Sequence, residues 1–141
     1  MKIIFKNNNV PSPLKNKKAV KILLISIFKK ESVDFEHITY IFCTDSYLLD
    51  LNRTFLKHHT LTDILTFPLS EPNQPIIAEI YISTERVKEN SFLFNTDFNH
   101  EIIRVIIHGT LHLCNYNDKT QAQKKKMRLK ENFYLNQYSF T

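Results

Sequence analysis

Residues 62–83 read TDILTFPLSEPNQPIIAEIYIS. The two ends of this stretch, residues 62–69 and 76–83, are rich in the β-branched and aromatic residues that favour strands. Between them, residues 70–75 contain two prolines and an asparagine, which favour a turn. We therefore expect an antiparallel pair of strands that forms half of a small sheet.

Two further strands are expected before this pair. Residues 1–6 form a short apolar stretch that ends before Pro11 and Pro13, neither of which can continue a strand ladder. In residues 37–43, Ile38, Tyr40 and Phe42 recur at every second position, which predicts a strand with these side chains on one side. Together with residues 62–83, these segments predict a sheet of about four strands.

Helices are expected between and after the strands. Residues 14–30 carry apolar side chains at helical spacing, with lysines mostly elsewhere. Capping residues begin four more helices: one starting at 44 or 45, one from 83 or 84 to about 94, one opened by 95–97 and reaching 113, and one at 120–138. No repeat or linker interrupts the chain, so we predict a single α+β domain over residues 1–141, with a mixed sheet packed against helices.

The composition excludes several classes of protein. Hydrophobic residues make up 43% of the chain and aromatic residues 12%, which excludes disordered and collagen-like chains. No apolar run approaches the roughly 18–20 residues of a membrane span, and the N-terminus does not resemble a signal peptide. We therefore expect a cytoplasmic protein with no membrane partner, in which Cys43 and Cys114 are reduced, buried and without chemistry.

The formal net charge of +5 suits an anionic partner such as RNA. The densest basic stretch is residues 124–130, near the end of the chain. On a helix its charges point in nearly every direction, which favours a solvated helix over a dedicated RNA stripe. Charge alone thus leaves RNA binding open.

His108 and His112 lie four residues apart, so on a helix both imidazoles point the same way. A catalytic zinc takes three protein ligands and keeps a fourth position for water. Asp118 is the best candidate third ligand, since residues 115–117 break the helix and can turn the chain back. Alternatively, both histidines are exposed or satisfied by neighbours. Gly109 stands where a His-Glu-x-x-His peptidase has its general base, which argues against peptide hydrolysis.

The segment His108-Gly109-Thr110-Leu111-His112-Leu113-Cys114-Asn115-Tyr116-Asn117-Asp118 resembles the His-Gly-x-Leu-His-Leu-x-Gly-Tyr-Asp-His signature of the YbeY family. The resemblance covers roughly residues 40–131 in one colinear order. Matching segments are Leu51-Asn52, residues 62–68, residues 79–83, Glu101, and Met127 with Glu131 at Met-x-x-x-Glu spacing.

This resemblance implies a zincin-like fold and a zinc-dependent, single-strand endoribonuclease of 16S rRNA 3′-end processing. The implied ligands are His108, His112 and Asp118, which bind one divalent metal. Implied partners are ribosomal RNA and the small ribosomal subunit, without a nucleotide cofactor. Two alternatives stay open: a non-catalytic ribosome-assembly or RNA-binding factor with a structural or decayed metal site, and a metal-dependent hydrolase of another substrate.

Three positions depart from the family pattern. The family's third metal-binding His falls at Asp118, its helix-ending Gly falls at Asn115, and an Arg that often follows the Leu-Asn segment falls at Leu56. Two imidazoles with one carboxylate are an established catalytic zinc set, although the same set suits other divalent ions. Loss of the Arg removes a guanidinium that would stabilise charge on a phosphodiester.

Other polar residues near the motif are weaker candidates. Lys57, His58 or His59 could stand in for the missing Arg, but a surface loop is the favoured interpretation. Glu101 lies nearly two turns before His108, where it either orients an imidazole or is an ordinary first-turn acid. Thr62 and Asp63 either line the cleft or form a turn before a strand. No general base is evident.

Overall fold

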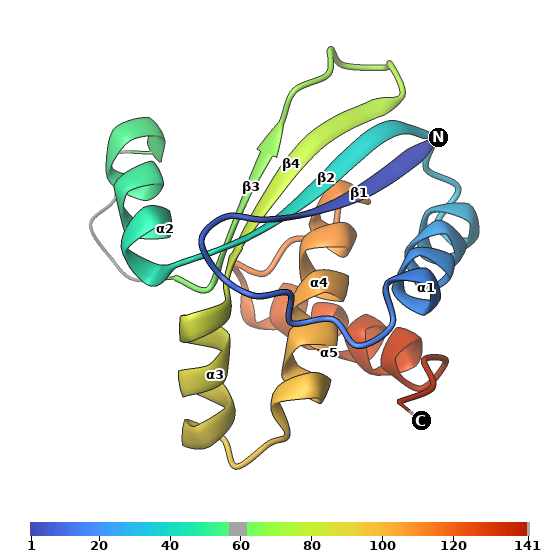
Figure 1. Ribbon diagram of the computed structural model, residues 1–141. Helices are drawn as coiled ribbons and strands as arrows, with labels where there is room; N and C mark the ends of the chain where they lie inside the picture. Colours follow the sequence, from blue (N-terminus) through green and yellow to red (C-terminus); the bar gives the residue numbers. More distant parts are fainter. Residues whose placement is uncertain (57–61, 141) are drawn as a thin grey trace.

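A four-stranded mixed sheet forms the centre of the molecule (Figure 1). The computed structural model describes residues 1–56 and 62–140. The strands are β1 (Lys2–Asn7), β2 (Phe35–Cys43), β3 (Ile64–Pro68) and β4 (Ile76–Ser83). Their order is β1-β2-β4-β3: β1, β2 and β4 run parallel, and β3 is antiparallel to β4. The predicted sheet and the predicted antiparallel pair are confirmed.

The helices also follow the predicted order. They are α1 (Lys17–Lys30), α2 (Asp45–Leu51) with a π-helical turn η1 (Asn52–Leu56), α3 (Thr84–Leu93), α4 (Phe98–Leu113) and α5 (Gln121–Leu135). Each α-helix begins after a polar side chain that accepts a backbone N–H of its first turn.

Two helix boundaries differ from the prediction. Helix α1 begins three residues later than expected, because the side chain of Asn16 caps it by accepting from the backbone N–H of Ala19. Helix α5 ends at Leu135 rather than near 138, and Asn136 forms its C-cap. Both errors lie at helix ends, where the spacing of apolar residues contains the least information.

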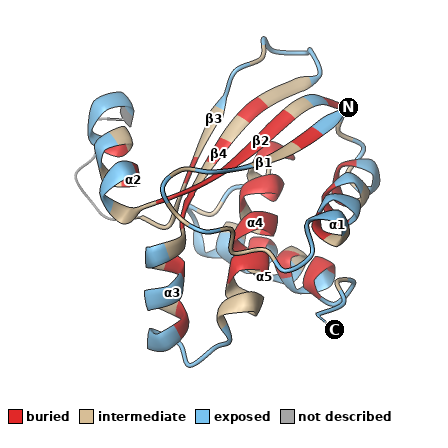
Figure 2. Ribbon diagram, viewed as in Figure 1, coloured by how far each residue is buried: buried red, intermediate tan, exposed pale blue. Residues whose placement is uncertain are grey.

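The two faces of the sheet are covered unequally (Figures 1 and 2). Helices α1, α4 and α5 cover one face, and the main core there includes Ile38, Tyr40 and Phe42 of β2. Helix α2 lies against the other face, over a small cluster of Cys43, Leu48 and Leu65. Because both faces are covered, every residue of β2 from 38 to 43 is buried, instead of every second one.

The single glycine of the chain brings α4 close to the sheet. A Cβ atom at Gly109 would lie 2.6 Å from Ile64 Cδ1 and 3.2 Å from Ile80 Cγ2. Position 109 therefore faces β3 and β4 and has no room for a side chain without repacking. A glutamate general base of the peptidase type has no place there, in agreement with the sequence argument against peptide hydrolysis.

The two cysteines are free and buried, as expected. Burial raises the pKa of each thiol to about 12, which keeps the sulfur protonated and unreactive near neutral pH. Within the described ranges, no helix has both the length and the apolar content to cross a membrane.

Candidate metal centre

Helix α4 and the turn after it position the three predicted ligands. His108 and His112 lie one turn apart on α4, on a side that is not packed against the sheet. The helix then ends at Leu113, and Asn115 adopts a left-handed conformation with a φ of 71°. The backbone N–H of Tyr116 donates back to the carbonyl of Leu111 at 3.1 Å. This reversal brings Asp118 back to the imidazoles.

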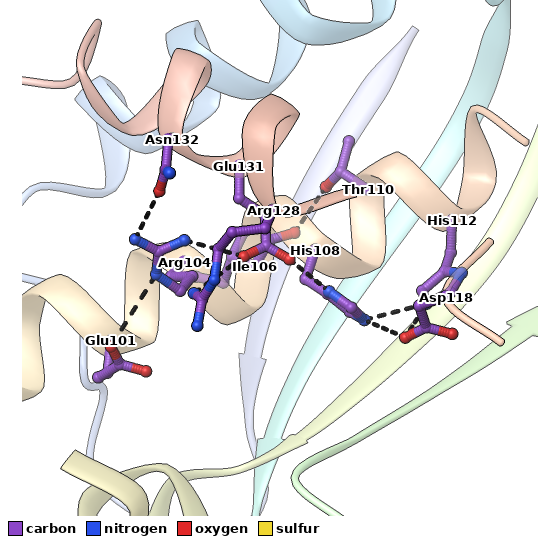
Figure 3. A network of polar contacts seen from close by, with 10 residues as sticks. All are labelled: Glu101, Arg104, Ile106, His108, Thr110, His112, Asp118, Arg128, Glu131 and Asn132. Atoms are coloured by element: carbon purple, nitrogen blue, oxygen red, sulfur yellow. Dashed lines mark hydrogen bonds and ion pairs between the residues drawn. The ribbon is translucent and has the colours of Figure 1, made fainter. Parts of the chain in front are cut away.

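The three side chains converge on one point (Figure 3). Asp118 Oδ2 lies 3.2 Å from His108 Nε2 and 3.4 Å from His112 Nε2, and the two Nε2 atoms are 3.0 Å apart. Ligands about 2.0–2.1 Å from a tetrahedral ion stand roughly 3.3–3.4 Å apart, so this triangle nearly matches one face of such a site. The donor set of two imidazole nitrogens and one carboxylate oxygen also fits a divalent cation.

Glu131 on α5 contacts His108 at Nδ1, the ring nitrogen that does not face Asp118 (Figure 3). Its Oε2 lies 2.7 Å from His108 Nδ1, and Arg104 Nη1 donates to its Oε1 at 2.9 Å. Arg104 Nη2 also donates to Asn132 Oδ1 at 2.9 Å, so two turns of α4 are tied to α5. With its Nδ1–H directed to a carboxylate, His108 presents the lone pair of Nε2 to a metal.

The acidic surroundings favour positive charge at His108. Burial lowers the pKa of His108, but the hydrogen bond and charge of Glu131, with the charges of Asp118 and Asp63, outweigh burial and raise it. Burial raises the pKa of Glu131, yet its hydrogen bonds to His108 and Arg104 outweigh that effect and lower it. A metal bound at Nε2 would take the place of a proton that this environment favours.

A cleft of about 290 Å³ opens beside His108. Its lining residues are Asp63, Ile64, Glu101, Arg104, Val105, His108, Asp118 and Glu131. Four of these are carboxylic acids and one is an arginine that is already paired with Glu131. Burial raises the pKa of Asp63, as do the charges of Glu101 and Glu131, whereas His108 lowers it. A divalent cation would balance much of this negative charge.

The family model described as Endoribonuclease YbeY matches residues 3–139. The chain belongs to the YbeY family. It is 41% identical over 138 residues to Endoribonuclease YbeY of Cytophaga hutchinsonii, an alignment that covers 98% of this chain and 96% of that relative. With Endoribonuclease YbeY of Flavobacterium psychrophilum it shares 46% identity over 106 residues, 75% of each chain.

A solved structure agrees with this membership. The solution structure of TM1509 from Thermotoga maritima matches with a TM-score of 0.66 and 32% sequence identity. The match covers 96% of this chain and 87% of that one. The YbeY resemblance and the α+β fold inferred from the sequence are therefore confirmed.

The structure brings His108, His112 and Asp118 of this YbeY chain together, but it gives Glu101 another neighbour. Glu101 Oε1 lies 4.0 Å from Arg104 Nε, and the carboxylate on an imidazole is that of Glu131. In the sequence, Glu131 stood out only through its Met-x-x-x-Glu spacing, and Arg104 was not predicted as a site residue. Arg104 lies one turn before His108 on the same helix, and this spacing is the signal that could have identified it.

The structure shows where two of the positions that depart from the YbeY pattern, Asn115 and Leu56, lie in the fold. Asn115 adopts the left-handed conformation for which glycine is usual, so the turn survives the substitution. Leu56 ends η1, and Lys57, His58 and His59 lie outside the described residues. Of the other weak candidates, Asp63 lines the cleft beside His108.

Proposed function

We propose that this protein is a zinc-dependent endoribonuclease that cleaves single-stranded ribosomal RNA and takes part in processing the 3′ end of 16S rRNA. One observation carries the proposal: two imidazoles and a carboxylate converge at 3.0–3.4 Å beside a cleft in a chain of the YbeY family. Its relatives named Endoribonuclease YbeY support the reaction class.

His108, His112 and Asp118 would hold the metal. When bound, such an ion supplies a Lewis acid for a phosphoryl oxygen and lowers the pKa of water toward about 7. The spacing of the three ligand atoms and the two imidazoles favour zinc over the larger, oxygen-preferring ions. Metal analysis of the purified protein, with binding compared among Zn²⁺, Mn²⁺ and Mg²⁺, tests this choice.

The surrounding residues orient the metal ligands and neutralise part of the negative charge around them. Glu131 fixes the ring of His108, and Arg104 neutralises the far oxygen of Glu131. The cleft carries too much negative charge to admit a phosphodiester unless a cation offsets it. Asp63, half-buried in the lining of the same cleft, is the carboxylate to which we assign uptake of a proton from an attacking water.

RNA as the substrate agrees with the net charge of +5. We place the reaction in the cytoplasm, on ribosomal RNA precursors associated with the small ribosomal subunit. No nucleotide cofactor is needed for metal-assisted hydrolysis of a phosphodiester.

The test is a cleavage assay on a precursor carrying the 3′ end of 16S rRNA. The zinc-loaded protein should cut it, chelation should stop cleavage, and added zinc should restore it. His112→Ala should be inactive while it still unfolds cooperatively. If the zinc-loaded protein binds this RNA without cutting it, the protein is a non-catalytic RNA-binding factor and the proposal is wrong.

A further inference from the structure

The connection between α4 and α5, residues 114–120, carries the most exposed of the three ligands. Asp118 has 39% of its side chain exposed, against 23% for His108 and 28% for His112. Backbone hydrogen bonds from Asn115 and Tyr116 hold the start of the connection to α4. At its other end, Gln123 Oε1 accepts the backbone N–H of Lys119 at 3.0 Å. The position of Asp118 thus depends on how the middle of the connection is anchored.

The side chain of Tyr116 anchors that middle part. Its hydroxyl donates to Oε1 of Glu31 at 2.7 Å, across 85 positions of the sequence. Glu31 is the C-cap of α1, and only 12% of its side chain is exposed. The ring of Tyr116 packs against the main core and has Lys126 Nζ 5.6 Å from its centroid. Ring and hydroxyl are therefore both fixed.

Glu31 is itself held by α5. The hydroxyl of Tyr134 donates to Oε2, and Lys130 Nζ lies 3.4 Å from the same oxygen. Burial raises the pKa of Glu31, but hydrogen bonds from Tyr134 and Tyr116 and the charge of Lys130 outweigh it and lower the pKa. The carboxylate therefore stays charged and keeps both oxygens as acceptors at neutral pH.

We propose that Glu31 is a positioning residue of the metal centre, which holds Asp118 against His108 and His112 by binding the hydroxyl of Tyr116. The inference rests on the metal centre of the proposed function. Tyr116 is two residues from Asp118, so loss of its anchor frees the part of the connection that delivers the carboxylate. The imidazoles stand on α4 and do not depend on Glu31.

Two tyrosines make a matched test, because both donate to Glu31 and only Tyr116 lies in the connection. Zn²⁺ affinity is measured by competition with a chromophoric chelator, and Co²⁺ absorption reports the ligand set. Since residues behind a ligand typically contribute 10–100-fold to metal affinity, Tyr116→Phe and Glu31→Gln should each weaken Zn²⁺ binding about tenfold. Tyr134→Phe should leave Zn²⁺ affinity close to that of the unsubstituted protein, although it also loses thermal stability.

A double-mutant cycle shows whether the effect passes through Asp118. In an Asp118→Ala background, Tyr116→Phe should have no further effect on Zn²⁺ affinity, because the carboxylate that it positions is gone. An equal loss in both backgrounds, or an unchanged affinity of Tyr116→Phe, would overturn the proposal.

The outcomes separate this inference from the proposed function. If the unsubstituted protein binds zinc and cleaves RNA while Tyr116→Phe binds zinc unchanged, only the positioning role is wrong. If it binds zinc with the expected differences among variants but does not cleave RNA, the positioning role stands and the nuclease assignment fails. If it binds no zinc at all, both are wrong.

Discussion

The metal centre has a helix-borne half and a loop-borne half. His108 and His112 stand on α4, whose opposite side packs against the sheet, whereas Asp118 stands on the connection between α4 and α5. Apolar burial therefore sets the positions of the imidazoles, and a few polar side chains set the position of the carboxylate. One metal site can thus depend on two unrelated kinds of interaction, which different substitutions should separate.

The helix-borne half is built into the core. Nine residues of α4 are buried, and Thr110 among them shares a 2.6 Å hydrogen bond with the buried hydroxyl of Tyr40 on β2. Moving this helix would disrupt the main core, so His108 and His112 keep their places without a metal. The loop-borne half has less apolar support: the ring of Tyr116 packs against the main core, and its hydroxyl donates to Glu31.

Removing one ligand from each half, in separate variants, should give the largest losses of Zn²⁺ affinity. The two losses should differ. Structural zinc sites with four protein ligands bind zinc by about 10–16 kcal/mol, so the share of one ligand corresponds to a loss of affinity of roughly 10²–10³-fold. His112→Ala should reach that range, because no other side chain can take a place fixed by a helix. Asp118→Ala should lose less, since water can enter at this more exposed position. Zn²⁺ competition titrations measure both, and an equal loss would contradict the distinction.

Glu131→Gln should weaken metal binding by the helix-borne half, although Glu131 is not itself a ligand. Losing the charged partner of a metal-binding imidazole typically costs 10–100-fold in metal affinity, and we expect a value in that range. The amide also leaves Arg104 without its strongest acceptor, so some stability is lost as well. Calorimetric titration with Zn²⁺ measures the affinity, and Glu89→Gln, at an exposed position of α3, is the control. An affinity equal to that of the control would show that His108 does not need Glu131.

Local sequence pattern predicted the helix-borne half far better than it predicted the residues that support the two halves of the metal centre. Apolar spacing and capping residues identify α4, and a spacing of four brings His108 and His112 to one side. Glu131 and Glu31 contact partners 23 and 85 positions away, across helix packings that no local period encodes. Local sequence could not predict the role of Gly109 either, because this role depends on the distance between α4 and two strands.

Gly109→Ala tests how closely α4 must approach the sheet. The added methyl meets the end of the Ile64 side chain, which can move, and Ile80, which has less freedom in the core. Overpacking of this kind costs about 1–3 kcal/mol, and we expect the lower end of the range because alanine also favours a helix. Urea unfolding measures the loss. A gain in stability would show that α4 can shift, and that the helix-borne half is less rigid than its packing indicates.

The smallest expected effect is the acid sensitivity that Glu31 contributes to the stability of the protein. The folded protein lowers the pKa of Glu31 below its ordinary value, so the stability from this carboxylate is present above that value and is lost as pH falls through the lowered pKa. Glu31→Gln lacks this contribution at every pH. The difference in unfolding free energy between the two metal-free proteins should therefore narrow as pH falls from neutral into the acid range. Glu131 titrates in both proteins, so its effect cancels.

Urea unfolding at a series of pH values measures this difference, with Glu36→Gln as a control at an exposed position of β2. The control should follow the unsubstituted protein throughout. A gap between Glu31→Gln and the unsubstituted protein that stays constant with pH would mean that shape rather than charge matters at position 31. The connection would then be held by packing, as α4 is, and the two halves of the metal centre would no longer differ in kind.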